Sequence, residues 1–328
     1  MPTDPIMSNI SVVVTFYNQP YEKLFHTLYS IIRQKNSSFD IIITDDGSEN
    51  FDQKKIENWF KNYHFARYVI VANKINQGTV LNALVGWKSS SSKYIKMLSP
   101  GDFLYNEDVL ANLVDYMDEV QADICFGKIA PYKVNQNGEI NIIYLKQPRD
   151  LQPYIQYNKK RIQYNYLIKR DYACGMSFAG KREEMIKYIN KIAGKARFYE
   201  DCTYIIMVAA GLNLRLWNQN IIWYEVGGGI STSASSEGAK RGYESTKITY
   251  ELIKREYPEW KKSYEPYERT LKAVTTKLIR GFYRRTFAKL KKQESIRPFT
   301  VITNHDYDVR ELETILNQHN SSFTDQTR

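Results

Sequence analysis

The sequence lacks the features that mark a membrane protein or a protein of an oxidising compartment. No run approaches the roughly 18 consecutive apolar residues that a transmembrane helix needs. The first residues, MPTDPIMSN, lack the basic end and apolar core of a signal peptide. The only cysteines are Cys125, Cys174 and Cys202, and no Cys-x-x-Cys pair occurs, which argues against a disulfide scaffold or a zinc site. We therefore expect a cytoplasmic protein.

Basic charge is concentrated in one part of the chain. The 328 residues carry 46 Lys or Arg and 36 Asp or Glu, a net charge of +10. Residues 240–292 hold sixteen basic and six acidic residues, a difference of +10, so the remaining chain is neutral overall. At roughly 150 residues per domain, this length predicts two domains or one domain with an appendage. We place the boundary after residue 235 and assign residues 236–328 to a basic helical segment.

Strands and helices alternate through the first hundred residues. Continuous apolar, β-branched runs predict buried strands at 10–16, 39–45, 66–73 and 93–98. The segments between them predict helices at 21–34, 51–62 and 78–90. This alternation is typical of βαβ units, so we expect an α/β fold with a mainly parallel sheet flanked by helices.

The pattern changes after residue 122. Asn137-Gly138, between two apolar runs, predicts a hairpin. Residues 150–180 have the composition of a tyrosine-rich loop. Helices are expected at 181–193, 201–211, 240–292 and 307–318, and two short strands at 212–217 and 221–226. Gly227 to Gly229 open a polar stretch that is either a loop closing over a ligand or a simple linker.

Polar clusters follow three of the predicted strands. The first strand ends in Thr15-Phe16-Tyr17-Asn18, the second in Asp45-Asp46-Gly47-Ser48 and the fourth in Ser99-Pro100-Gly101-Asp102. In a parallel sheet these clusters lie at the same edge, where ligands bind. The first turn has no glycine, which excludes the dinucleotide-binding fingerprint, and a P-loop is absent. The residues present suit a base and ribose, with phosphate charge met by a carboxylate-held divalent cation.

Six motifs together resemble glycosyltransferase family 2, which has the GT-A fold. They are SVVVTFYNQ, the helix end SIIRQ, FDIIITDDGS, NQGTVLNALVGW, YIKMLSPGDFLY and FYEDCTYIIMVAAG, in the family's order, from about residue 9 to about residue 232. The resemblance implies an inverting transferase that uses a nucleotide-sugar, most often a UDP-sugar, with Mn²⁺ or Mg²⁺. It also implies a donor half at about 9–105 and an acceptor half at about 106–235.

The resemblance carries roles to particular residues on the donor side. Thr15 and Tyr17 match the family's nucleoside contacts, and Asp46 matches the carboxylate that reads the base edge, with Asp45 beside it. Further donor contacts implied are Asn76, Gly78 and Gly101. For Asp45 a cap on the next helix is an equal alternative, and for Asn76 and Gly78 an ordinary helix start.

The metal motif departs from the family. SPGD stands where the family has D-x-D, so only Asp102 matches a metal-ligating position. Pyrophosphate oxygens and water could supply the other ligands. The family's histidine after the last strand is also missing. Asp201 matches the general base that takes a proton from the acceptor hydroxyl, and Glu200 matches a contact to acceptor or donor. Both carboxylates would also suit a helix N-terminus for electrostatic reasons alone.

Two functions follow as alternatives. The first is an inverting glycosyltransferase that moves a sugar, from UDP-hexose or UDP-N-acetylhexosamine, to a lipid-linked or protein-linked glycan in surface polysaccharide or glycoprotein biosynthesis. The second is a catalytically weakened GT-A domain that binds nucleotide-sugar or partners. The basic helical segment could dock on the body, form a homo-oligomer or lie on an anionic membrane at the inner face of the plasma membrane. No nucleic-acid motif is present, so nucleic acid is not an expected partner.

Overall fold

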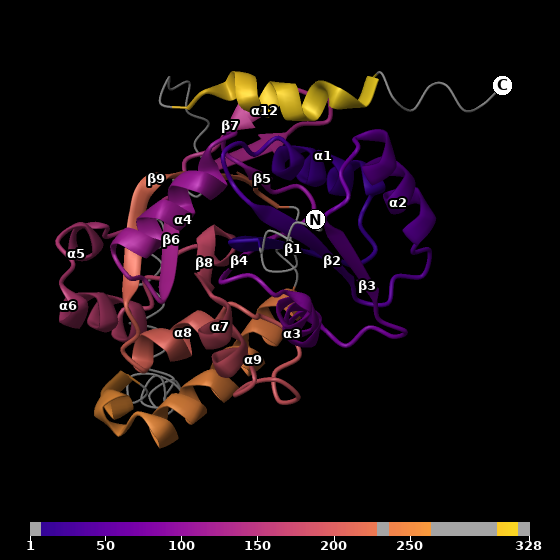
Figure 1. Ribbon diagram of the computed structural model, residues 1–328. Helices are drawn as coiled ribbons and strands as arrows, with labels where there is room; N and C mark the ends of the chain where they lie inside the picture. The colour runs from indigo at the N-terminus through magenta and orange to yellow at the C-terminus, as the bar shows by residue number, and fades with distance from the viewer. Residues whose placement is uncertain (1–7, 228–235, 264–306, 321–328) are drawn as a thin grey trace, which may run out of the picture.

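The computed structural model describes residues 8–227, 236–263 and 307–320. Within these residues nine strands form one sheet, in the order β3-β2-β1-β4-β8-β6-β9-β5, with β7 paired to β6 (Figure 1). The expected fold class, an α/β sheet flanked by helices, is confirmed.

One half of the sheet is parallel. It consists of β1 (Ile10–Phe16), β2 (Phe39–Asp45), β3 (Tyr68–Ala72) and β4 (Tyr94–Leu98). Every residue of β4 is buried, as are six of the seven residues in each of β1 and β2. Burial on both faces explains why these strands read as unbroken apolar runs rather than as alternating patterns.

The other half is mixed. It consists of β5 (Phe103–Leu104), β6 (Ile124–Val134), β7 (Ile140–Ile142), β8 (Phe178–Lys181) and β9 (Leu214–Glu225). β8 runs antiparallel to both β4 and β6, and thereby joins the two halves. β6 and β7 form the hairpin that Asn137-Gly138 predicts, and Gly138 has the positive φ, +81°, that such a turn requires.

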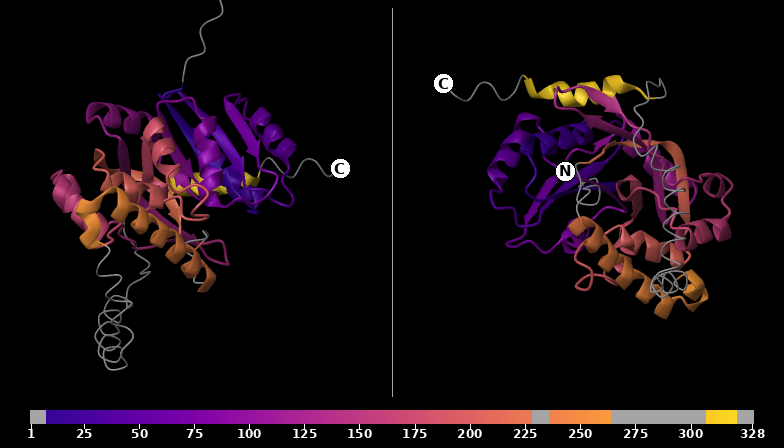
Figure 2. Two further views of the ribbon diagram at one scale, coloured as in Figure 1. Left: turned by 90° about the horizontal axis from the view of Figure 1, so that it is seen from below. Right: turned by 180° about the vertical axis from the view of Figure 1, so that it is seen from behind.

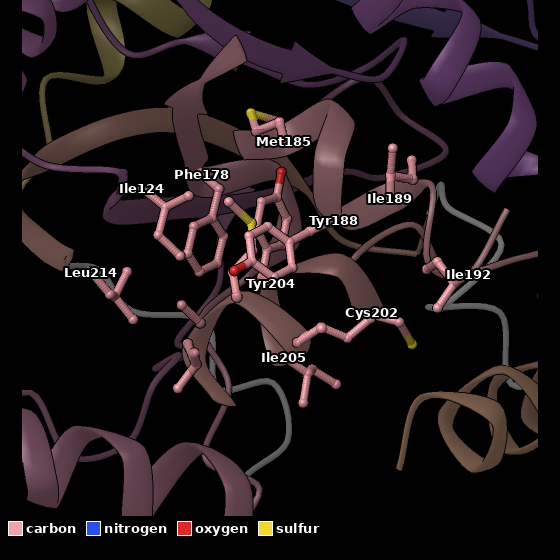
Figure 3. Close-up of a cluster of buried hydrophobic side chains, with 14 of the residues drawn as sticks. Ile124, Phe178, Met185, Tyr188, Ile189, Ile192, Cys202, Tyr204, Ile205 and Leu214 are labelled. Carbon is pink, nitrogen blue, oxygen red and sulfur yellow. The ribbon is translucent and has the colours of Figure 1, made fainter. Parts of the chain in front are cut away.

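Helices cover both faces of the sheet. On one face, α1 (Tyr21–Ile32), α2 (Gln53–Asn62) and α4 (Val109–Glu119) bury their apolar sides in a core that they share with β1 and β2. On the other lie α3 (Thr79–Ser89), α7 (Arg182–Ile189) and α8 (Cys202–Ala209). Figure 3 shows part of the second core, where the rings of Phe178 and Tyr204 stack with centroids 4.0 Å apart.

Two local predictions were wrong. The segments 212–217 and 221–226 form one strand, β9, because the polar residues between them are absorbed by register shifts opposite Gly127 and Lys128. Residues 150–180 are not a loop. They contain α5 (Gln152–Ile155), α6 (Lys159–Gln163), a π-helical turn (Tyr164–Ile168), a 3₁₀ turn (Gly175–Ser177) and β8.

The described parts of the C-terminal segment pack on the body at two places. α9 (Ser236–Glu256) buries Tyr250 and Ile253 against the core around α8, and a 3₁₀ turn (Pro258–Ser263) follows it. α12 (Val309–Leu316), which the sequence predicts, buries Leu312 and Ile315 beside β7 and α1, and a final 3₁₀ turn (Asn317–Asn320) follows. Figures 1 and 2 show the two helices at opposite ends of the molecule.

Both described helices of the C-terminal segment therefore contact the body. The domain boundary that we place after residue 235 stays a prediction. None of the helices in the described ranges is long and apolar enough to cross a membrane. Residues 264–306, which include most of the helix predicted at 240–292, lie outside the described residues.

Candidate functional site

A cavity of about 670 Å³ lies beyond the carboxyl ends of β1, β2 and β4. Its other walls come from the start of α3, the 3₁₀ turn at Gly175, the segment that precedes α8, the end of β9 and the first turns of α9. This is the edge at which the sequence predicts ligand binding. Seven of the ten predicted site residues line the cavity: Thr15, Tyr17, Asp46, Asn76, Asp102, Glu200 and Asp201.

The predicted nucleoside end is formed by the ends of β1 and β2. Tyr17, at the end of β1, is 38% exposed and so presents its ring to the cavity. The Asp46 carboxylate accepts hydrogen bonds from the backbone N–H groups of Gln77, at 2.8 Å, and Gly78, at 2.9 Å. Burial raises the pKa of Asp46, and these two N–H donors counter that rise. Asp46 thus fixes the start of α3 and borders the cavity at the same time.

The other three predicted residues shape the backbone around the cavity. Asp45 accepts hydrogen bonds from the N–H groups of Gly47 and Ser48 at 3.0 and 2.9 Å, so it holds the turn after β2. At Gly78, φ is +93° and an added Cβ would lie 2.2 Å from the Arg197 carbonyl oxygen. At Gly101, φ is +101° and an added Cβ would lie 2.4 Å from a Glu225 carboxylate oxygen. Only glycine fits these two close approaches without strain.

Asp102 lines the cavity and is 5% exposed. Its Oδ1 accepts a hydrogen bond from the Glu225 backbone N–H at 3.1 Å. Burial raises the pKa of Asp102 to about 7, although this hydrogen bond and the nearby Lys96 ammonium group lower it. Lys96 is fully buried in β4, and burial lowers its pKa to about 7. A cation bound beside Asp102 would favour the ionised form of this carboxyl group.

The residues present could hold a divalent cation, but they offer it few protein ligands. Within the described ranges, no group of three or more His, Cys, Asp or Glu side chains could hold a metal ion. Mg²⁺ and Mn²⁺ that are held mainly by substrate phosphates need only one or two carboxylates, and Asp102 meets that need. The second acidic side chain at this point, Glu225, forms an ion pair with Lys23 at 2.5 Å.

The acidic pair lies where the sequence predicts it, at the head of α8. Asp201 is the N-cap residue, yet its side chain makes no capping hydrogen bond. An added Cβ at Gly175 would lie only 2.1 Å from Asp201 Oδ1, so the carboxylate rests directly against that glycine. Burial first, and then the neighbouring Glu200, raise the pKa of Asp201. Asp201 thus lines the cavity as a buried carboxyl group with a raised pKa and without a capping hydrogen bond.

Several lining residues escape the sequence analysis. Arg197 donates a hydrogen bond from Nη2 to Asn76 Oδ1 at 2.7 Å, and so closes the nucleoside end of the cavity. Glu225, the last residue of β9, also lines the cavity. Lys240, Arg241 and Glu244 come from α9, in the segment that we assign outside the catalytic domain. The one sequence motif next to any of these residues is the one that begins at Phe198, directly after Arg197.

The tyrosines of residues 144–172 do not reach the cavity. Of this group, Tyr154 and Tyr166 are buried in the core, and Tyr172 shares a hydrogen bond with Tyr250 of α9, with 2.7 Å between the hydroxyl oxygens. Packing is therefore the observed role of these three tyrosines. The aromatic part of the wall comes from other residues, among them Tyr17, Tyr199 and Tyr224. Residues 228–235, which hold most of the glycine-rich stretch, lie outside the described residues.

Solved structures share the fold. Crystal structures of S. aureus TarS 1–349, in complex with UDP and with UDP-GlcNAc, superpose with TM-scores of 0.53 and 0.52 at 15% sequence identity. Each alignment covers 82% of this chain and 76% of the TarS fragment. The chain spans only 43% of the longer TarS structure that it matches. No curated protein matches the chain.

The sequence itself carries the assignment. A family model described as glycosyl transferase family 2 matches residues 11–185. The match covers β1 to β8 and all of the donor-side motifs, and it ends before Glu200 and Asp201. Since it spans 175 of the 328 residues, the chain belongs to glycosyl transferase family 2.

Proposed function

We propose that this protein is an inverting glycosyltransferase that moves a hexose or N-acetylhexosamine from a UDP-sugar to a glycan acceptor. The observation that carries the proposal is the single cavity that brings Tyr17, Asp46, Asp102 and Asp201 together from four separate motifs. Family membership supports the reaction class. The TarS complexes with UDP and UDP-GlcNAc, on the same fold, support the donor class.

The chain's own residues suffice for a direct displacement. The nucleoside binds at Thr15, Tyr17 and Asp46, which places the sugar toward α8. Asp201 takes the proton of the acceptor hydroxyl as its oxygen attacks the anomeric carbon, and the bond to the diphosphate breaks on the opposite face. One displacement inverts the configuration. A divalent cation, when bound at Asp102, would neutralise charge on the leaving diphosphate.

A catalytically weakened domain is the second candidate. It is favoured by one observation, the single carboxylate that SPGD offers to a metal. The carboxylates that line the cavity at Asp46, Glu200 and Asp201 support turnover instead. Release of UDP from a UDP-sugar in the presence of acceptor separates the two, since a binding domain would retain donor without releasing UDP.

The acceptor and the cellular location are also part of this proposal. We place the acceptor among lipid-linked or protein-linked glycans of surface polysaccharide or glycoprotein biosynthesis, with a cytoplasmic enzyme at the inner face of the plasma membrane. The basic residues of 270–292 would provide the membrane contact or a homo-oligomer contact. Membrane binding would weaken as salt screens exposed charge, whereas an apolar contact between subunits would not.

Calorimetric titration with UDP tests the donor assignment. We expect UDP to bind, and Mn²⁺ to tighten the binding through Asp102 because a cation held there would neutralise phosphate charge. Asp102→Ala should remove most of the Mn²⁺ effect, and Asp115→Ala, an exposed residue of α4, should retain it. Absence of UDP binding with Mn²⁺ present would reject the donor. A metal effect that survives in Asp102→Ala would assign the ligand to another residue.

A further inference from the structure

The helix α9 enters the cavity, although it lies outside the part of the chain that matches the family. Lys240, Arg241 and Glu244 line the wall. The approach is close, because an added Cβ at Gly242 would lie 2.8 Å from the ring of Tyr199. Behind this contact, α9 is anchored in the core by Tyr250 and Ile253. The basic side chains are thus held on a fixed element and not on a free tail.

The basic side chains of α9 lie beside the loop of residues 197–201, and this loop defines their position along the cavity. The loop begins at Arg197, which bonds Asn76 at the nucleoside end, and ends at Asp201, the proposed base. Phe198 lies between them, and the Arg241 guanidinium lies over its ring, 4.7 Å from the centroid. α9 therefore crosses the wall between the nucleoside end and the reacting end. In a nucleotide-sugar, the diphosphate occupies that interval.

Charge on the wall makes cations necessary there. Six of the lining residues are acidic, namely Asp46, Asp102, Glu200, Asp201, Glu225 and Glu244. Only Arg197, Lys240 and Arg241 are basic. A diphosphate brings further negative charge into this acidic cavity, and SPGD offers one carboxylate for a compensating metal ion. Arg197 bonds Asn76, and α9 supplies the other two basic side chains of the wall.

We propose that Lys240 and Arg241 bind the diphosphate of the donor directly, so that a nucleoside diphosphate binds this protein even without a divalent cation. Lysine and arginine form strong, charge-assisted hydrogen bonds to phosphate oxygens, and both side chains can donate here from one helix turn. This inference rests on the proposed function, since it assumes a nucleotide donor. It adds a phosphate site outside the metal motif and explains how the site functions with only one carboxylate in that motif.

The test compares UDP with uridine by calorimetry in EDTA at low salt. In the wild-type protein, UDP should bind at least tenfold more tightly than uridine. In Lys240→Ala/Arg241→Ala, UDP affinity should fall by roughly 10- to 100-fold while uridine affinity stays unchanged, because only the phosphate contacts are lost. The charge-preserving variant Lys240→Arg should bind UDP within about threefold of wild type, since the side chain keeps its charge.

A matched control removes two charges from the same helix outside the cavity. Lys247→Ala/Lys254→Ala changes exposed residues of α9 and should bind UDP as the wild type does. If the control loses as much UDP affinity as the test variant, general helix charge is responsible and the proposal is overturned. If Arg241→Ala disturbs the loop, uridine affinity will fall as well. In that case the single variant Lys240→Ala, which changes an exposed side chain, is measured instead. A lower ratio of UDP to uridine affinity supports the proposal, and an unchanged ratio overturns it.

Other outcomes separate this proposal from the function on which it rests. If the cations serve a phosphate on the acceptor, the ratio of UDP to uridine affinity will be unchanged in the double variant, which overturns the proposal. If uridine binds but UDP binds no better without metal, the proposal also fails while the nucleotide donor stands. If neither ligand binds the wild type, even with Mn²⁺, the proposed function itself fails.

Discussion

Asp201→Asn should lower the rate of sugar transfer by roughly 10²- to 10⁴-fold and leave UDP affinity nearly unchanged. The amide keeps the size of the side chain but cannot accept the proton of the attacking hydroxyl. UDP binding should survive, because Asp201 lies at the α8 end of the cavity, away from the nucleoside contacts. UDP release with the acceptor, and calorimetry with UDP, provide the two measurements. Turnover close to wild type would reject Asp201 as the base.

The control is Asp115→Asn, which makes the same change on the exposed face of α4 and should retain full activity. Asp201→Glu adds a second comparison. It keeps the basic group but lengthens the side chain, so we expect an intermediate rate. Retained UDP binding in both cavity variants would show that they fold and that the loss lies in the chemical step.

The pH dependence gives an independent reading of the same residue. Asp201 is a base only when ionised, and burial together with Glu200 raises its pKa above the usual value of about 4. The acidic limb of kcat/KM against pH should therefore lie well above pH 4, with activity rising as the pH passes the raised pKa. Glu200→Gln removes a neighbouring negative charge and should move that limb to lower pH. A wild-type limb near pH 4 would contradict the assignment.

The sequence predicts the parallel half of the sheet well because burial leaves a local signature. β1, β2 and β4 are buried on both faces, so they are continuous apolar runs bounded by turn residues. The same topology places their carboxyl ends at one edge. It follows that Thr15, Asp46 and Asp102 can be expected to meet without any knowledge of long-range contacts.

The mixed half is harder to predict because its signals are not local. Asn218 and Gln219 look like a turn between two strands, yet β9 continues through them because β6 accepts the register shift. The tyrosines of 150–180 look like a loop, yet Tyr154 and Tyr166 are core residues of short helical turns. In each case the partner that decides the structure is distant in the sequence.

The residues that α9 contributes to the cavity are also hard to predict from the sequence, for the same reason. Residues 240–292 stand out by charge alone, which suggests an appendage with an external partner. In the structure, Gly242 allows α9 to approach Tyr199, and Tyr172 shares a hydrogen bond with Tyr250. These contacts bring Lys240 and Arg241 to the wall. A glycine that is needed only for close packing against a distant ring cannot be distinguished, in a single sequence, from an ordinary helical glycine.

Gly175 offers the sharpest test of how the carboxylate of Asp201, the proposed base, is positioned. Gly175→Ala should lower the transfer rate by about 10²-fold or more, since a misplacement of about 1 Å is enough for such a loss. The added Cβ would lie 2.1 Å from Asp201 Oδ1, whereas ordinary contact begins at 3.4 Å, so the carboxylate has to retreat. The backbone is not at issue, because φ at Gly175 lies outside the left-handed region.

A double-mutant cycle separates this effect from general damage to the fold. If Gly175→Ala acts by displacing the Asp201 carboxylate, adding it to Asp201→Asn should cost little further activity, because the base is already gone. Transfer rates of the two single variants and the double variant, each with its UDP affinity, complete the cycle. Losses that simply multiply in the double variant would mean that Gly175 shapes the acceptor wall independently of Asp201. Loss of UDP binding in Gly175→Ala would instead show that the variant disturbs the whole cavity.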